Sequence, residues 1–486
     1  MTSSAAPARP PAPHCTIVPP YLLAALAASG DPRVAEPAVA TLRVDDLIRR
    51  GRVTAELRPG RSGPQPALEP GTGEGPQRTV YDAQQGTSLP GTEVRGEGDP
   101  ATGDEAVSQA YDGLGDTWAL WRQAYGRSSL DDKGLPLVAT VHYGRDYDNA
   151  FWDGRQMVFG DGDGVVFLGF TRSLDVIGHE LAHGVTQYTS GLNYQGQSGA
   201  LNESVSDVFG VLVKQHVLGQ SADQADWLVG AELLAPGVQG IALRSMAAPG
   251  TAYDDPRLGR DPQPAHMRDY VSMSEDNGGV HVNSGIPNKA FHDLAVALGG
   301  NAWEVPGQIW YDTIVGEIRA DCDFVTFAGL THAAARARYG DGSREAEAVA
   351  AAWAGVGLAL DGAPAGDDAG EVEPQVPETP QVPQAPTPGT EVTVRRTGGI
   401  AGIVRERTVP LAELPDADSH QWRTLLEQGR LRRIAEAADD ASRTRPDAFC
   451  YGVSCAQPVL DVQLPEPALT DEVRDLLERT LSPGGA

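Results

Sequence analysis

Cysteine is scarce in this sequence, and long apolar runs are missing. Only four cysteines occur among 486 residues, namely Cys15, Cys322, Cys450 and Cys455. They are too few and too scattered to form the disulfide framework of a small secreted protein. Every apolar run in the sequence is much shorter than the run of about 18 residues that a membrane-spanning helix needs. We therefore expect a chain that lives in a reducing compartment and has no membrane partner.

An ordinary secretory signal is also missing from the N-terminus. The opening "MTSSAAPARPPAPHCTIVPPYLLAALAASG" has a short apolar stretch at 21–28, but prolines interrupt the segment before it and no basic-then-apolar pattern forms. We expect the protein to be cytoplasmic, or exported without an ordinary signal peptide.

Basic residues are outnumbered, 38 against 66 acidic residues, which gives a net charge of -28. This balance disfavours binding to nucleic acid or to an anionic membrane. Residues 1–70 depart from it, because they hold 8 Arg, no Lys and 6 acidic residues, a net charge of +2. The N-terminal segment and the strongly acidic remainder are therefore expected to attract each other.

The chain is too long for one core, and its 57 Gly and 37 Pro indicate many turns and connections. Short alternating runs such as "LVATVHYG" predict a β-rich part, and longer helical periods follow residue 173. A Pro-rich acidic stretch then precedes a small α+β unit. We predict four segments: 1–75, a prosegment with a cleavable connection; 76–361, a catalytic domain; 362–391, a linker; and 392–486, a small C-terminal domain.

The stretch "LDVIGHELAHGVTQ" places His179, Glu180 and His183 in one apolar run. Two histidines four residues apart leave the same face of a helix, which suits two imidazole ligands of one tetrahedral zinc ion. The alternative is a pair of histidines that are simply satisfied on a buried helix.

A second helical stretch, "ALNESVSDVFG", places Glu203 and Asp207 on one face. A catalytic zinc needs three protein ligands and one open position, so Glu203 is the predicted third ligand beside His179 and His183. Asp207 is expected to hold the outer nitrogen of a ligand histidine. The alternative for this pair is a solvated acidic helix face.

With "HELAH", "NESVSD", "DNAFWDG" and "EDNGGVHVNSG" in this order, residues 76–361 resemble the thermolysin family of metallopeptidases. The resemblance implies an α+β, two-lobed peptidase with a β-rich N-terminal lobe, an α-helical C-terminal lobe and the zinc helix between them. It also implies a zinc-dependent neutral endopeptidase that cuts protein or peptide substrates on the N-terminal side of large hydrophobic residues.

The resemblance further implies catalytic roles for four residues. Glu180 would take the proton of the attacking water and pass it to the leaving amine. Tyr194 and His281 would donate to the developing oxyanion. Asp276, five residues before His281, would orient and charge that imidazole.

Substrate-binding residues follow from the same resemblance. Asn149 and Ala150 would pair with the substrate backbone, and Arg244 would hold a substrate carbonyl. The pocket for the residue after the scissile bond would be lined by six apolar side chains, several of which could equally be ordinary core: Phe167, Phe170, Val176, Val229, Leu233 and Leu243.

Calcium is where the chain departs from the family pattern. Calcium-rich members carry a carboxylate at the position of Lys214, and Leu228 and Ala231 also stand where calcium ligands are expected. The double calcium site therefore looks lost, and we predict that Lys214 pairs with the remaining Asp175 and Asp226.

The two ends of the chain resemble regulatory segments. "HCTIVPPYLL" resembles the short prosegment of the protealysin-like branch, which implies a latent precursor whose N-terminal segment blocks the cleft until self-cleavage. For Cys15 we favour a plain thiol over a thiol that approaches the zinc. Residues 392–484, with "VRRTGGIAGIVRE", "PDAFCYGVS" and "LTDEVRDLLERTL", resemble the inhibitor emfourin, here fused to its own target. The alternative is a substrate-docking or partner-binding module.

Two functions remain after these observations. The first is a monomeric zinc endopeptidase with its own prosegment and C-terminal domain as intramolecular inhibitors. The second is a latent peptidase fold that acts as a protein-binding regulatory scaffold. Glu180, Tyr194 and His281 favour the first, because a scaffold has no need of a general base.

Overall fold

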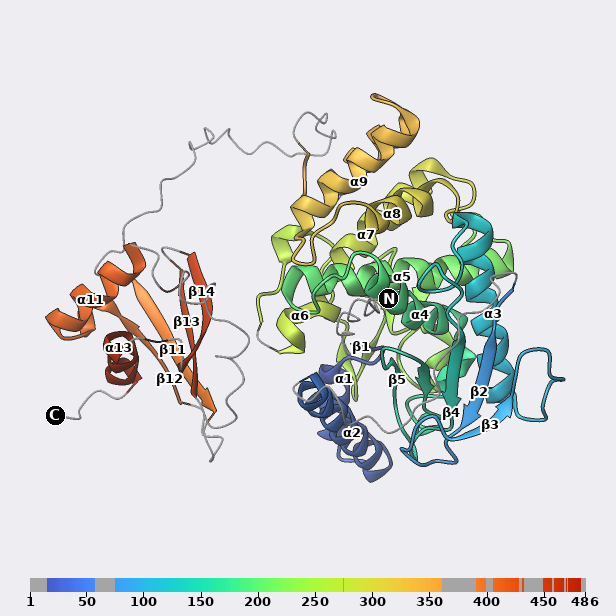
Figure 1. Ribbon diagram of the computed structural model, residues 1–486, viewed down its shortest axis with the longest axis horizontal. Coiled ribbons are helices and arrows are strands. Elements are labelled where there is room, and N and C mark those ends of the chain that lie inside the picture. Colours follow the sequence, from blue (N-terminus) through green and yellow to red (C-terminus); the bar gives the residue numbers. More distant parts are fainter. Residues whose placement is uncertain are drawn as a thin grey trace, which may run out of the picture. The chain divides into compact units, whose positions relative to one another are not determined.

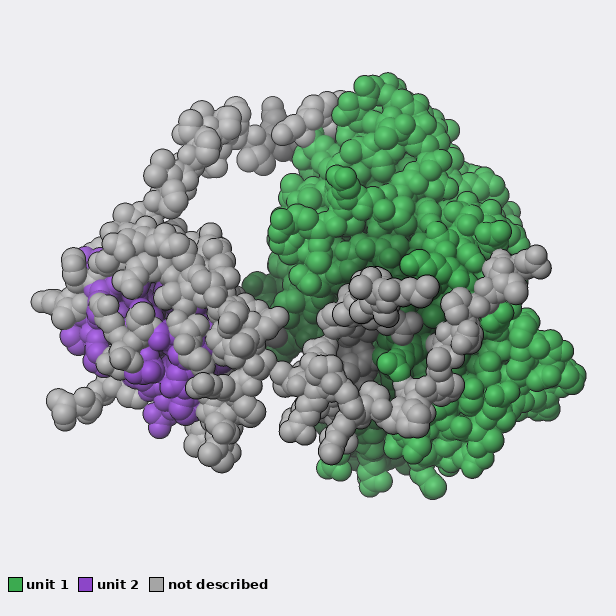
Figure 2. Space-filling model, in the orientation of Figure 1, with its two compact units in different colours: residues 1–369 green, residues 370–486 purple. Residues whose placement is uncertain are grey.

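The computed structural model describes residues 15–56, 75–273 and 275–360 of the N-terminal part, and residues 390–398, 405–427, 431, 449–456, 459–466, 469 and 471–481 of the C-terminal part. The chain divides into two compact units, residues 1–369 and 370–486, which Figure 2 colours separately. Each unit is described by itself. Nearly all of the predicted linker and of the predicted cleavable connection lies outside the described residues.

A mixed six-stranded sheet forms the β-rich lobe, with the strand order β1-β5-β6-β4-β2-β3 (Figure 1). β2 is parallel to β4 and β4 to β6, whereas β5 runs antiparallel to β6 and β1 antiparallel to β5. The first strand thus comes from the N-terminal segment and extends the sheet of the first unit. The strands are β1 (Cys15–Thr16), β2 (Arg78–Asp82), β3 (Thr92–Arg95), β4 (Leu137–Val141), β5 (Ala150–Trp152) and β6 (Met157–Phe159).

The β-rich lobe also contains a long helix, α3 (Glu105–Tyr125), in a region where the sequence analysis named only strands. Its start is fixed by Asp104, whose side chain accepts from the backbone N–H of Val107, and its end by Gly126 in the left-handed conformation. The helix packs against β2 and β4 and buries apolar residues at helical spacing.

Two buried helices, α4 (Leu174–Tyr188) and α5 (Gly196–Leu218), pack against each other at the centre of the first unit. Glycine allows their close approach. A Cβ atom on Gly210 would lie 2.4 Å from the carbonyl oxygen of Asp175, and one on Gly178 would lie 3.1 Å from the Cα of Gly210. The backbones therefore meet without intervening side chains, which brings side chains of the two helices close together.

The helical lobe follows α5 and has a core of stacked aromatic rings. The indoles of Trp310 and Trp353 are parallel with centroids 6.0 Å apart, and Phe291 meets Trp310 edge-on. Its helices are α6 (Asp276–Asn283), α7 (Gly285–Leu298), α8 (Val305–Val315), α9 (Phe324–Tyr339) and α10 (Arg344–Gly355). Short strands and 3-10 turns connect α5 to α6: β7 (Leu228–Val229), η2 (Ala231–Leu233), β8 (Arg244–Ser245), β9 (Asp254–Asp255), β10 (Gly259–Arg260) and η3 (Met267–Asp269). One further 3-10 turn, η1 (Phe170–Arg172), precedes α4.

After β1, the N-terminal segment continues as α1 (Pro20–Ala27) and α2 (Pro32–Glu56), two helices that pack together. α2 contacts the stretch before β5, because Thr41 accepts from the backbone N–H of Asp148 at 3.0 Å and Asp45 accepts from Tyr147 and Asn149. The described part of this segment is therefore packed on the rest of the first unit.

The second unit is a four-stranded antiparallel sheet with the order β12-β11-β13-β14 and two described helices. Its core centres on the buried Trp422, whose indole N–H donates to Thr480 at 2.9 Å. The elements are β11 (Glu391–Gly398), β12 (Arg405–Pro410), η4 (Leu411–Glu413), α11 (Asp416–Glu427), β13 (Phe449–Ala456), β14 (Val459–Pro465) and α13 (Asp471–Leu481).

Candidate metal centre and active site

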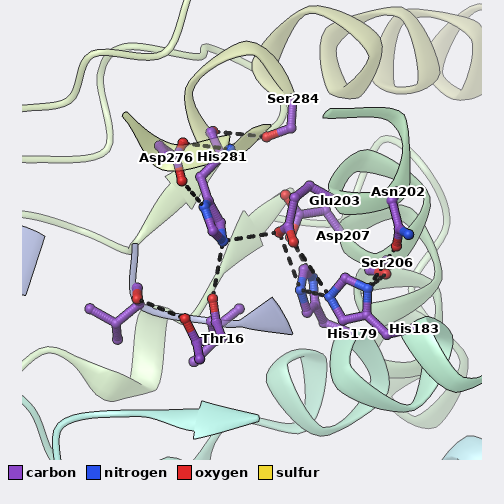
Figure 3. Close-up of polar contacts among 12 residues, drawn as sticks. Thr16, His179, His183, Asn202, Glu203, Ser206, Asp207, Asp276, His281 and Ser284 are labelled. Atoms are coloured by element: carbon purple, nitrogen blue, oxygen red, sulfur yellow. Dashed lines mark hydrogen bonds and ion pairs between the residues drawn. The ribbon is translucent and has the colours of Figure 1, made fainter. Parts of the chain in front are cut away.

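His179, His183 and Glu203 converge between α4 and α5 (Figure 3). The Nε2 atoms of the two histidines lie 3.0 Å apart. Each is 3.5 Å from a carboxylate oxygen of Glu203, and all three side chains are buried. Two histidines at i and i+4 on one helix and a carboxylate on the next thus present their ligand atoms to one point.

The outer nitrogens of both histidines are held by neighbours on α5. Asp207 contacts the Nδ1 of His179 at 2.8 Å, whereas Asn202 and Ser206 contact the Nδ1 of His183 at 2.8 and 3.0 Å. These contacts leave both Nε2 atoms directed at Glu203, which is how a protein fixes metal-ligating imidazoles.

The charge states of these residues also fit a zinc ion. Burial lowers the pKa of His183 to about 3, so its imidazole is neutral. Burial opposes ionisation of Glu203, but the neighbouring histidines, His281 first, still lower the pKa of its carboxyl group. Two imidazoles and a carboxylate are the ligand set of many catalytic zinc sites, and Glu203 Oε2 is buried without a hydrogen-bond partner.

Glu180 lies beside this ligand set on α4 and is fully buried. One carboxylate oxygen, Oε2, accepts from the backbone N–H of Trp152 in β5 at 2.9 Å. The other, Oε1, has no hydrogen-bond partner. Burial, followed by the charge of Glu203, raises the pKa of the Glu180 carboxyl group well above its usual range.

His281 approaches the same point from α6. Its Nδ1 lies 2.5 Å from Asp276, which also accepts from the His281 backbone N–H at 2.9 Å (Figure 3). Although burial acts in the opposite direction, the charges of Asp276 and Glu203 raise the pKa of His281 to about 9. Asp276 has a positive φ of 52°, at the start of the turn that directs its carboxylate onto His281. The hydroxyl of Tyr194 contacts the Nε2 of His281 at 3.2 Å and also Glu203.

Residues 16–18 of the N-terminal segment bind directly to residues of this site. The carbonyl of Thr16 accepts from His281 Nε2 at 3.1 Å, and the carbonyl of Ile17 accepts from Arg244 at 3.2 Å. Asn149 binds Val18 twice, because its Oδ1 accepts from the Val18 N–H at 2.9 Å and its Nδ2 donates to the Val18 carbonyl at 3.2 Å.

Family comparisons agree with this arrangement. The family described as "Thermolysin metallopeptidase, catalytic domain" matches residues 71–187, and "Thermolysin metallopeptidase, alpha-helical domain" matches residues 190–358. An "Extracellular metalloprotease" of Pectobacterium carotovorum subsp. carotovorum is 51% identical over 350 residues, which is 71% of this chain and 97% of that protein. The chain belongs to the thermolysin family of metallopeptidases.

Other matches define the branch. The "Emfourin" family matches residues 394–481. The solved "Precursor of Protealysin, Metalloproteinase from Serratia proteamaculans" is 50% identical with a TM-score of 0.65, and the match covers 71% of this chain and 100% of that one. A "Thermolysin" of Alicyclobacillus acidocaldarius subsp. acidocaldarius is 39% identical over 289 residues, 57% of this chain and 50% of that protein. The chain is thus a protealysin-like zinc metalloendopeptidase of the thermolysin family with an emfourin-like C-terminus.

The predicted substrate-binding residues of this thermolysin-family chain are buried. Ala150 lies in β5, and its backbone carbonyl accepts from the N–H of Ile17 at 3.2 Å. Arg244 is fixed by two contacts of 2.8 Å to Asp207, so the carboxylate that holds His179 also holds this guanidinium. The six predicted pocket residues all belong to the main core cluster, and they are Phe167, Phe170, Val176, Val229, Leu233 and Leu243.

Lys214 is the residue that was expected, from the sequence, to take the place of a calcium-binding carboxylate. Its Nζ atom is 3.2 Å from Asp175, 3.0 Å from Asp226 and 3.6 Å from Glu232. Burial acts to lower the pKa of Lys214, but these carboxylates raise it above the usual range. The predicted ion pairs with Asp175 and Asp226 are therefore present, and Glu232 adds a third. The other two departures, Leu228 and Ala231, lie in β7 and η2.

Sequence reasoning missed several residues that support the site. Asn202 and Ser206 are four apart on α5 and both contact His183, a spacing that could have revealed them. Asn288 of α7 donates to Asp207 at 2.8 Å, and Trp152 reaches Glu180 through its backbone. No sequence signal identifies these last two, because both contacts depend on how distant elements pack.

Proposed function

We propose that the chain hydrolyses peptide bonds on the N-terminal side of large hydrophobic residues, and that it is made as a latent precursor. The observation that carries this proposal is the convergence of the two histidine Nε2 atoms and the Glu203 carboxylate, each within 3.5 Å of the next, with Glu180 alongside. His179, His183 and Glu203 would hold the zinc ion. Zinc supplies a Lewis acid that polarises the scissile carbonyl and lowers the pKa of a water molecule.

Glu180 would act as the general base and then as the general acid. Its Oε1 is the oxygen without a hydrogen-bond partner, whereas Oε2 is fixed by the Trp152 N–H. The raised pKa of this buried carboxyl group favours accepting a proton near neutral pH and returning it to the leaving nitrogen.

His281 and Tyr194 would donate hydrogen bonds to the oxygen on which negative charge develops. Asp276 keeps His281 protonated, and the imidazolium can therefore donate from Nε2. In the precursor a backbone carbonyl, that of Thr16, already accepts from this nitrogen. A substrate carbonyl would take the same place.

Arg244, Asn149 and Ala150 would hold the substrate backbone, since they bind residues 17 and 18 of the N-terminal segment in this way. Beyond them, the apolar side chains of Phe167, Phe170, Val176, Val229, Leu233 and Leu243 would accept the residue after the scissile bond. Their apolar surfaces favour a large hydrophobic side chain.

The N-terminal segment would act as an intramolecular inhibitor until it is removed. Its strand fills the edge of β5, and its carbonyls occupy the donors that a substrate needs. The emfourin-like unit would be a second inhibitor of the same chain, which we propose is a monomer. Among the described residues, none of the helices is long and apolar enough to cross a membrane. We propose that the protein is cytoplasmic, or exported without an ordinary signal peptide.

Proteolysis of casein by the matured chain tests the peptidase proposal. We expect cleavage that stops when a zinc chelator is added, returns with zinc, and is lost in Glu180→Ala, which removes the base but none of the metal ligands. Mapping the cut bonds should place large hydrophobic residues directly after them. Hydrolysis that survives in Glu180→Ala after trace wild-type enzyme is excluded would contradict the assignment of the base.

A further inference from the structure

Two neutral donors just before β5 bind a carboxylate of the N-terminal segment. Tyr147 donates its hydroxyl to one oxygen of Asp45 at 2.5 Å, and the Nδ2 of Asn149 donates to the other oxygen at 3.1 Å. Asp45 lies on α2 and is fully buried. The Tyr147 hydroxyl and the Asn149 Nδ2 thus form a carboxylate site in which each oxygen has its own donor.

The side chain of Asn149 connects this carboxylate site to the path of a bound peptide. Its Nδ2 also donates to the carbonyl of Val18 at 3.2 Å, and its Oδ1 accepts from the Val18 N–H at 2.9 Å. The Val18 carbonyl and the Asp45 carboxylate therefore share one donor nitrogen and lie close together. Under the proposed function, Thr16 places its carbonyl where the substrate carbonyl would lie, so Val18 occupies the place of the second residue after the scissile bond.

The surroundings of the carboxylate site favour a bound anion. The ring of Tyr147 meets the rings of Tyr143 and Phe151 edge-on, with centroids 5.2 and 6.2 Å apart. Burial, followed by the charge of Asp45, raises the pKa of Tyr147 well above its usual value, so its hydroxyl remains a donor at neutral pH. Burial also raises the pKa of Asp148, which favours a neutral carboxyl group and weakens its repulsion of a bound carboxylate. Hydrogen bonds to a charged acceptor are stronger than those between neutral groups.

Removal of the N-terminal segment takes Asp45 away and leaves both donors to the substrate. We propose that the matured chain binds an acidic side chain of its substrate in the carboxylate site, carried by the second or third residue after the scissile bond. An aspartate or glutamate at either position begins beside the peptide group that Asn149 holds. An asparagine would offer one acceptor oxygen in place of two, and so would leave one donor unsatisfied. This inference rests on the proposed peptidase activity and adds a preference beyond the large hydrophobic residue.

Cleavage of paired peptides by the matured chain tests the proposal. Each pair contains one bond before a leucine, has amidated C-termini and differs only in aspartate against asparagine, at the second residue after the cut in one pair and at the third in the other. We expect the aspartate peptide of at least one pair to be cut with about tenfold higher kcat/KM, through a lower KM, because substrate and transition state make the contact equally. Tyr147→Phe, which removes the hydroxyl and keeps the ring, should abolish most of this preference. The matched control Tyr143→Phe, in the same aromatic cluster, should keep it.

The comparison of peptides in the wild-type chain does not depend on how a variant folds. Equal cleavage of aspartate and asparagine peptides in both pairs overturns the carboxylate site and leaves the peptidase proposal standing, because both peptides are cut. A preference of unchanged size in Tyr147→Phe overturns the role of the hydroxyl. A preference found only in peptides with a free C-terminal carboxylate overturns the assignment to an acidic side chain. If the matured chain cuts none of the peptides, the two proposals fail together.

Discussion

At the residue scale, a substitution of Lys214 tests whether its ammonium group has replaced calcium as the cation among the carboxylates. Its partner Asp175 is fully buried, so Lys214→Met leaves a buried carboxylate without its cation. We expect a loss of roughly 2–4 kcal/mol in the free energy of unfolding, measured by urea denaturation of the Glu180→Ala chain. The matched control is Lys289→Met, which removes a partly exposed helical pair with Asp293 and should cost no more than about 0.5 kcal/mol.

The same position predicts how the chain responds to calcium. With the ammonium of Lys214 among the carboxylates, the wild-type melting temperature should be the same in calcium and in a calcium chelator. A calcium-dependent rise would contradict the replacement, because a ligand that binds the folded state raises its stability with concentration.

Individual residues also show how far the sequence could lead. The spacing of His179 and His183 predicts two ligands on one helix face, because it depends only on helix geometry. The position of Cys15 could not be read in the same way. The sequence analysis favoured a plain thiol, whereas the fold pairs Cys15 with Trp152, 137 residues further along the chain, and places it beside the ligands. Local spacing encodes the first relation, and only tertiary packing encodes the second.

At the scale of elements, the packing of α4 on α5 should control metal binding. A Cβ atom on Gly210 would collide with the Asp175 carbonyl at 2.4 Å, so Gly210→Ala must push the two helices apart. We expect a loss of about 1–3 kcal/mol in stability and weaker zinc binding, measured by competition with a chromogenic chelator. Gly329→Ala in α9 is the matched control, since a Cβ atom there would meet nothing within 4 Å and alanine favours a helix. Equal zinc affinity in both variants would be inconsistent with this role of the glycine.

The start of α3 depends on an ion pair that titrates. His142 lies between Asp161, at 2.8 Å, and Asp104, at 3.0 Å, and Asp104 is also the N-cap of α3. The hydrogen bond to Asp161, opposed by burial and followed by the contact with Asp104, raises the pKa of His142 to about 9. The ion pair of protonated His142 with the two carboxylates therefore stabilises the folded chain fully below the unfolded pKa of about 6.5. This stabilisation is lost as the pH rises through 9.

His142→Gln should thus destabilise the Glu180→Ala chain by roughly 1–2 kcal/mol at pH 6.5 and by much less at pH 10. The expected loss is kept small because both carboxylates are partly exposed and solvent screens their interaction with His142. Urea denaturation at both pH values measures the difference. His332→Gln in α9 is the control, because burial lowers the pKa of that histidine and its effect should not shrink as the pH rises. A constant effect of His142→Gln at both pH values would show that the pair does not titrate in this range.

The helices and strands differ in how clearly the sequence predicts them. The alternating run "LVATVHYG" predicted β4, and the helical stretches that carry the two histidines and Glu203 predicted α4 and α5. Helix α3 was not predicted, although its Asp cap, its terminal Gly126 and its helical spacing are present in the sequence. The pairing of residues 15–16 with the sheet was not predicted either, because strand pairing between distant segments leaves no local periodicity.

At the scale of the whole molecule, the emfourin-like unit shares one chain with the peptidase, and this connection sets its effective concentration. Covalent linkage gives the inhibitor a high effective concentration at the peptidase, so even a weak inhibitor can remain bound in cis. We expect a matured chain that ends at Asp361 to cleave casein faster than the matured chain that keeps residues 362–486. The Glu180→Ala version of each should be inactive, which shows that the measured activity belongs to this site.

Dilution separates inhibition within the chain from inhibition between chains. Inhibition in cis does not depend on protein concentration, so the ratio of activities of the two matured chains should stay constant over roughly a hundredfold dilution. Inhibition in trans should weaken on dilution. Inhibition of the truncated chain by a separately produced fragment of residues 390–486 should weaken in the same way. If the two chains cleave equally well at every concentration, the C-terminal unit does not restrain the peptidase and its role is docking of a substrate or partner. The peptidase assignment is unaffected by that result, because it depends on Glu180 and the metal ligands, all of which precede residue 361.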